Sequence, residues 1–209
     1  MRAIASTAAV IAGLVGFTIG SAQASLLVQA GNIPQIDDNV ISSATCASHI
    51  DGPALLIQGC LNGSHSTLVD FTSDENIVYA SGGQAKVDAT DADGYSRLMV
   101  DVVGHTFDTL ILNIEADANG EVSFTDGSST SSLFGISASG SNFFTITGGP
   151  FSFISFTTFN TTGTTETDIV ADVKQNRIGG VSTIPEPATL GIIGLGLAGL
   201  GFMRRRRIV

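Results

Sequence analysis

The sequence contains no tryptophan, only two tyrosines, and few basic residues for its length. Residues 25–183 hold four basic side chains, at Lys86, Arg97, Lys174 and Arg177, against eighteen acidic ones, so this segment has a net charge near −14. Such a surface repels nucleic acids and other polyanions, which excludes a nucleic-acid-binding role. Without tryptophan, the chain also lacks the largest flat side chain on which a sugar ring could stack.

Motifs of the common catalytic families are missing as well. The three histidines are His49, His65 and His105, and the chain has no H-E-x-x-H, G-x-S-x-G or P-loop sequence. A serine-rich chain with many carboxylates could still assemble a hydrolytic site, but no spacing in the sequence selects one. We therefore predict a protein that is not an enzyme, and keep a secreted hydrolase acting on extracellular polysaccharide or peptide as the alternative.

The chain has two cysteines, Cys46 and Cys60, both in the segment between the two apolar ends. An even number of cysteines in an oxidising compartment favours a disulfide. The spacing fits no common metal-ligand pattern, which makes a thiol nucleophile or metal pair the weaker interpretation. We expect a Cys46–Cys60 disulfide, whose loop of about 15 residues would stabilise the fold by about 3 kcal/mol.

The first 24 residues have the three zones of a secretory signal. A single charge at Arg2 precedes an uncharged, mostly apolar stretch that ends in Ser21-Ala22-Gln23-Ala24. Small residues at Ala22 and Ala24 match the positions that a signal peptidase recognises, so we expect cleavage before Ser25. An uncleaved membrane anchor is the alternative.

The C-terminal residues form a second ordered pattern. Pro185-Glu186-Pro187 is followed by sixteen uncharged residues, 188–203, and then by Arg204, Arg205, Arg206 and Arg207. Sixteen helical residues rise about 24 Å, which is short for a bilayer core of about 30 Å and suits a temporary transmembrane helix. Four arginines hold their end of such a helix in the cytoplasm.

This tail resembles the PEP-CTERM sorting signal of Gram-negative bacteria, with Ile184 in place of the usual valine. The resemblance covers residues 184–209 and implies recognition by a membrane-embedded exosortase, in bacteria that typically make an exopolysaccharide. It implies nothing about the chemistry of residues 25–183. The chain thus divides into a signal peptide (1–24), a passenger domain (25–183) and a sorting tail (184–209).

Strand patterns dominate the passenger domain, and helical periodicity is scarce. Ser81-Gly82-Gly83 and Asn119-Gly120 have the composition of hairpin turns, and the segment before residue 68 is the least regular. About nine short strands favour an all-β, antiparallel β-sandwich or jelly roll, flanked by a signal helix and a transmembrane helix. The expected strands cover residues 76–80, 84–88, 96–102, 109–115, 121–125, 142–147, 151–159 and 169–178.

One acidic segment is a candidate metal site. Asp88, Asp91 and Asp93 precede Gly94, and calcium favours several carboxylates on a tight loop of an extracellular protein. The position of the bidentate glutamate of an EF-hand would fall on Val100, which rules out that motif. Two interpretations stay open: a looser calcium site in the loop, or a solvated Asp-Gly turn between strands.

Together these features predict a non-enzymatic, exported envelope or matrix protein that serves adhesion or exopolysaccharide contact. Its partners would be signal peptidase, an exosortase, the membrane through its C-terminal helix, and an exopolysaccharide. We expect transient anchoring with the C-terminus in the cytoplasm and a final location at the cell surface or in the extracellular matrix. Apart from calcium, no cofactor is expected.

Overall fold

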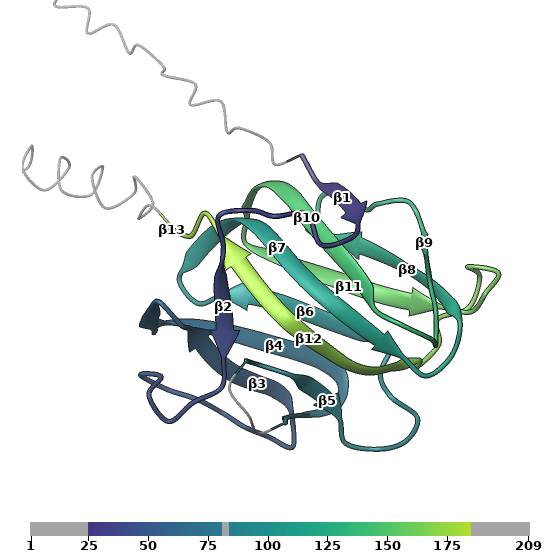
Figure 1. Ribbon diagram of the computed structural model, residues 1–209, viewed down its shortest axis with the longest axis horizontal. Coiled ribbons are helices and arrows are strands. Elements are labelled where there is room, and N and C mark those ends of the chain that lie inside the picture. Colours follow the sequence, from purple (N-terminus) through teal and green to yellow (C-terminus); the bar gives the residue numbers. More distant parts are fainter. Residues whose placement is uncertain (1–24, 81–83, 185–209) are drawn as a thin grey trace, which may run out of the picture.

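The computed structural model describes residues 25–80 and 84–184, and these residues form an all-β structure (Figure 1). Every strand pair in these ranges is antiparallel, which confirms the all-β, antiparallel part of the predicted fold class. The predicted signal and transmembrane helices lie outside the described residues. The strands are β1 (Leu27–Ala30), β2 (Asp38–Ile41), β3 (Ala54–Leu61), β4 (Ser64–Tyr79), β5 (Val87–Ala89), β6 (Arg97–Val102), β7 (His105–Ala116), β8 (Gly120–Thr125), β9 (Phe134–Ile136), β10 (Asn142–Phe151), β11 (Phe153–Phe159), β12 (Val170–Gly179) and β13 (Ser182–Thr183).

The strands follow one hydrogen-bonded path in the order β1-β10-β7-β12-β2-β3-β4-β6-β11-β8-β9. Figure 1 shows this path doubled over, so that β10, β7 and β12 lie in front of β11, β6 and β4. Side chains from both halves meet in the space between them. The rings of Phe124 on β8 and Phe144 on β10 are 5.0 Å apart, although these two strands do not pair. The doubled sheet therefore encloses one hydrophobic core.

Alternation along the strands supplies that core. On β6, Leu98, Val100 and Val102 are buried, while the residues between them are more exposed. Phe156 on β11 adds a third ring beside Phe124, with centroids 6.1 Å apart. These offset and edge contacts are the arrangements that aromatic rings prefer. The predicted period-two pattern of residues 96–102 is confirmed.

Strand β5 closes a second connection between the two halves. It pairs with both β4 and β12, so that β12, β2, β3, β4 and β5 form a closed ring of pairings. The predicted pairing on either side of residues 81–83 is confirmed by the register of Tyr79 with Val87.

The segment after β1 crosses the outer face of β10, where Thr145 donates a hydrogen bond to the carbonyl of Gly31.

The Cys46–Cys60 disulfide is present, with 5.6 Å between the two Cα atoms. Cys60 lies on β3 and is fully buried, whereas Cys46 belongs to the irregular segment between β2 and β3. The bond therefore holds that segment against the sheet. Contrary to the expectation of an irregular N-terminal part, β3 and β4 form a long hairpin with Asn62-Gly63 as its turn.

The second predicted hairpin is wrong. Asn119-Gly120 joins β7 to β8, but β7 pairs with β10, β12 and β13, and β8 pairs with β9 and β11. The chain crosses here from one half of the sheet to the other. Gly120 is required for a different reason than a turn: a Cβ atom would overlap the carbonyl oxygen of Phe159 and the side chain of Ile169.

The phenylalanine-rich stretch also differs from its prediction. Residues 151–159 were expected to form one strand. Phe151 instead ends β10, so the chain turns at Ser152 and β11 starts at Phe153. Ile154 and Phe156 face the core, and Phe153 lies on the other face.

Candidate functional site

A bulge in β12 shapes the candidate site on the surface of the passenger domain. Lys174 pairs with Asn113 and Arg177 with Ile111, so β12 has one more residue than β7 between these pairs. Gln175, inside the bulge, has φ of 55°, the only positive φ of a non-glycine residue in the described ranges. This backbone conformation is unfavourable for a residue with a side chain, and such strain concentrates at functional positions.

The residue next to Gln175 fixes the bulge. The Asn176 side chain is fully buried, and its Nδ2 donates to the carbonyl oxygens of Ala85 at 3.2 Å and Val173 at 3.3 Å. With Asn176 turned inward, Gln175 is directed outward and is exposed. The bulge therefore presents Gln175 on the surface and anchors it from below.

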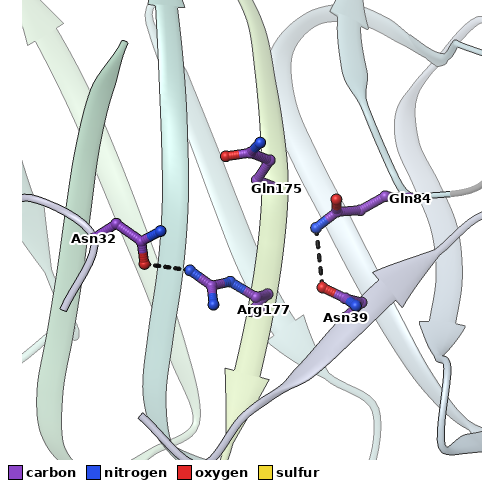
Figure 2. Close-up of a pocket in the computed structure, with 5 residues that line it drawn as sticks. All are labelled: Asn32, Asn39, Gln84, Gln175 and Arg177. Carbon is purple, nitrogen blue, oxygen red and sulfur yellow. Dashed lines mark hydrogen bonds between the residues drawn. The ribbon is translucent and has the colours of Figure 1, made fainter. Parts of the chain in front are cut away.

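A shallow pocket of about 240 Å³ lies over this bulge (Figure 2). Its lining comes from three parts of the chain: residues 32–39, residue 84 and residues 175–177. Asn39 lies on β2, Gln84 precedes β5, and Asn32 lies in the segment that crosses β10. Gln84 Nε2 donates to Asn39 Oδ1 at 3.1 Å. Four of the five lining side chains are primary amides, each of which carries both donors and an acceptor.

The fifth lining residue is Arg177, the cation of the pocket. Its guanidinium donates to Asn32 Oδ1 and lies 3.6 Å from Asp37 Oδ2. The Arg177 side chain is 22% exposed and that of Asp37 is 10% exposed, so the pair is largely withdrawn from water. Because Asp37 offsets the charge of Arg177, the pocket presents hydrogen-bonding groups without a strong positive field.

A row of three charged side chains crosses the neighbouring strands. Asp172 on β12 lies opposite Asp88 on β5, and Lys86 Nζ lies 2.9 Å from Asp88 and 3.0 Å from Asp172. Burial tends to lower the pKa of Lys86, but hydrogen bonds to both carboxylates outweigh it and raise that pKa. At Asp172 burial prevails over the attraction of Lys86, and the pKa is raised.

Both pKa values are raised, which favours the charged form of Lys86 but the neutral form of Asp172. The difference in burial between the two side chains explains these opposite consequences. The side chain of Lys86 is 38% exposed and stays hydrated, whereas that of Asp172 is only 7% exposed. Removing water therefore penalises the carboxylate far more than the ammonium group. The arrangement has the features of a structural ion pair between β5 and β12.

A second set of carboxylates meets a serine. Ser96 lies within hydrogen-bond distance of both Asp74 and Glu166, at 2.8 Å from Glu166 Oε1. Arg97 pairs with Glu166 and donates its backbone N–H to Asp74 at 3.0 Å. Ser96 is only 2% exposed, which leaves its hydroxyl little access to a substrate. The contacts join the middle of β4, the start of β6 and the segment after β11.

The predicted calcium ligands are not brought together. Asp88 is engaged by Lys86, and residues 25–80 and 84–184 contain no group of three or more His, Cys, Asp or Glu side chains that could hold a metal ion. Asp91 and Asp93 lie exposed in the loop between β5 and β6. Calcium binding at Asp88, Asp91 and Asp93 stays a prediction.

The predicted processing residues lie mostly beyond the described ranges. Ala22, Ala24, Pro185, Glu186, Pro187 and Arg204–Arg207 all fall outside them. Ser25, the expected new N-terminus, is the first described residue, and its backbone nitrogen donates to the carbonyl of Gly148 at 3.0 Å. Among the described residues no helix is long and apolar enough to cross a membrane.

The family models give one match, to the PEP-CTERM protein-sorting motif, at residues 183–207. The chain carries a PEP-CTERM sorting motif. This confirms the resemblance found in the sequence and indicates an exported protein that an exosortase processes, located at the surface or outside a Gram-negative bacterium. No curated protein and no solved structure matches the chain.

One feature of the sequence does indicate the pocket over the β12 bulge, although the strand prediction passed over it. In the final predicted strand, residues 174–177 read Lys-Gln-Asn-Arg, four polar residues that interrupt the alternation of apolar side chains. Such an interruption indicates a bulge, and here it marks the two β12 residues that line the pocket. Asn32, Asn39 and Gln84 had no comparable signal.

Proposed function

We propose that this PEP-CTERM protein is a non-enzymatic component of the extracellular matrix whose β-sandwich passenger binds the exopolysaccharide of its own cell. The apolar segment 188–203 holds it transiently in the membrane, with Arg204–Arg207 in the cytoplasm, until the exosortase acts. The observation that carries the binding proposal is the amide-lined pocket over the β12 bulge.

The chemistry of the pocket favours sugar hydroxyl groups. Hydroxyls both donate and accept hydrogen bonds, and the amides of Asn32, Asn39, Gln84 and Gln175 match them in both roles. The pocket offers no aromatic ring, so stacking does not contribute. With about 1 kcal/mol per hydrogen bond, a single pocket would bind weakly, and many copies on one polymer would supply avidity.

The net charge of the passenger and the charge balance in the pocket favour a neutral saccharide as the ligand. The passenger has a net charge near −14, from four basic and eighteen acidic residues, and repels an anionic polymer. Within the pocket, Asp37 compensates the guanidinium of Arg177. Binding to a neutral polymer should therefore be nearly insensitive to salt, whereas a carboxylate-specific interaction would weaken as salt is added.

Binding is tested with the purified matrix polysaccharide of the producing bacterium and the passenger, by calorimetry or co-sedimentation. Gln84→Ala should weaken binding at least fivefold, because it removes an amide from the pocket wall. Gln29→Ala is the matched control, since Gln29 is an exposed amide on β1, outside the pocket. Equal affinities of the two variants would refute the pocket as the binding site.

Gln175→Gly separates binding from folding. Glycine adopts a positive φ without steric penalty, so this variant should be more stable than the wild type by about 1 kcal/mol. If Gln175 serves the ligand, the more stable protein should bind the polysaccharide less well. Unchanged binding would show that the side chain has no role in recognition.

A secreted hydrolase is the competing function, and the same preparations distinguish it. A hydrolase would release reducing ends from polysaccharide, or new amino termini from peptide, on prolonged incubation. Asp74→Asn and Glu166→Gln would then abolish the release, because these are the two carboxylates that converge on Ser96. Stoichiometric binding without release supports the matrix role.

A further inference from the structure

The last described residues of the passenger domain run beside β7 in two successive ladders. β12 pairs with β7 through Gly179 opposite Thr109, and β13 pairs with the same strand through Ser182 opposite Thr106. Each step is three residues along both strands, so β13 continues the register of β12. The ladder extends past β13, because the nitrogen of Ile184 donates to the carbonyl of Gly104 at 3.3 Å. Figure 1 shows β13 just beyond the end of β12.

Two glycines bring the chain into this position. Gly180 has φ of 67°, and a Cβ atom there would overlap the side chain of Asp108 on β7. A Cβ atom on Gly179 would overlap the carbonyl oxygen of Ile36. The residues between β12 and β13 are therefore packed closely against β7 rather than free of it.

The ladder overlaps the sorting motif. The motif begins at residue 183, so it includes Thr183, which pairs with β7, and Ile184, which is hydrogen-bonded to Gly104 in the turn before β7. The next residue is Pro185, which has no N–H to donate. The backbone groups that pair with β7 are not available to an enzyme that binds this segment as an extended chain.

We propose that β13 is a latch: the sorting enzyme gains full access to the start of the motif only when residues 182–184 peel away from β7. The latch competes with the enzyme for the same backbone groups, so the fraction of open chains limits the rate of processing. It also links processing to folding, because the ladder exists only after β7 and β12 have formed. The proposal rests on the sorting motif and is independent of the saccharide pocket.

A locked variant tests the latch in cells that make the exosortase, with the full chain followed by pulse-chase and gel mobility. Ser182 and Thr106 lie opposite each other, and both are outside the matched motif. Directly opposed residues of an antiparallel pair lie within the distance that a disulfide spans. The double variant Ser182→Cys/Thr106→Cys should be processed about tenfold more slowly than either single variant, and a mild reductant should restore the rate.

An opened variant tests the same idea without a new disulfide. Ser182→Pro removes a backbone donor from β13 and should speed processing several-fold, whereas Ser182→Ala keeps the backbone and should match the wild type. Ser182 is exposed, so the fold of the domain should tolerate both changes. Wild-type processing rates in both the locked and the proline variants would overturn the latch. Loss of polysaccharide binding would leave these rates unchanged.

Discussion

Two carboxylates face each other across the outer side of the sheet, and they predict how stability depends on pH. Asp70 on β4 lies opposite Asp101 on β6, and Gln58 Nε2 donates to Asp70 at 2.7 Å. Like charges directly opposite on neighbouring strands are destabilising. Burial, and then the charge of Asp70, raise the pKa of Asp101 from 3.8 to about 6.

The sign of the effect follows from proton binding. Between pH 4 and pH 6 the folded protein holds the proton of Asp101 while the unfolded chain has lost it, so the folded state binds more protons. The contribution of Asp101 to stability is therefore fully present below pH 4 and is lost as pH rises through 6. A shift from 3.8 to about 6 corresponds to at most about 3 kcal/mol. Because Asp101 is only partly buried, solvent screening reduces this to about 1 kcal/mol.

Asp101→Asn should consequently stabilise the passenger at neutral pH and have no such effect in acid. The amide has nearly the same shape and carries no charge to oppose Asp70. At pH 7.5 the variant should be about 1 kcal/mol more stable than the wild type, with an unfolding midpoint about 2–4 °C higher, and the two proteins should converge near pH 4. Urea unfolding at several pH values between 4 and 8 measures the difference.

Glu75→Gln is the control for this experiment. Glu75 lies on the same strand as Asp70 but is exposed. Its substitution by glutamine removes the same charge from the protein as Asp101→Asn does. Its effect on stability should be small throughout the pH range. An Asp101→Asn variant that is no more stable than Glu75→Gln at pH 7.5, or whose advantage persists at pH 4, would refute the reasoning.

Three further predictions concern the fold. Replacing both Cys46 and Cys60 by alanine should lower the free energy of unfolding by about 3 kcal/mol, measured with denaturant against the intact disulfide. Gly120→Ala should destabilise by about 1–3 kcal/mol, because its methyl group meets backbone, while Gly135→Ala, where space is open, should be nearly neutral. Calcium, if bound at the loop after β5 as one interpretation of the sequence holds, should raise the unfolding midpoint above that in chelator, and equal midpoints would count against the site.

The sequence predicted most of the strands after residue 76, but it missed β3 and most of β4, and it assigned β7 and β8 to each other as partners. Alternation identified residues 96–102 because their environment is decided locally, by one buried and one exposed face. Asn119-Gly120 has the composition of a hairpin, yet β7 and β8 separate there, because both find their partners far along the chain. The Asn-Gly pair that does form a hairpin turn, at residues 62–63, lies in the segment that looked irregular.

The sorting tail could be recognised from sequence while the pocket could not, and the reason is how each is specified. A sorting enzyme reads a continuous segment, so the order of a tripeptide, an apolar stretch and arginines carries the whole signal. The pocket is assembled by the fold: Asn32 and Arg177, which are in contact, are 145 residues apart in sequence. The latch combines both kinds of information, because residues 183–184 belong to the linear motif while their partners on β7 are supplied by the fold. A sorting motif joined to a passenger that lacks this ladder should therefore be processed without waiting for that passenger to fold.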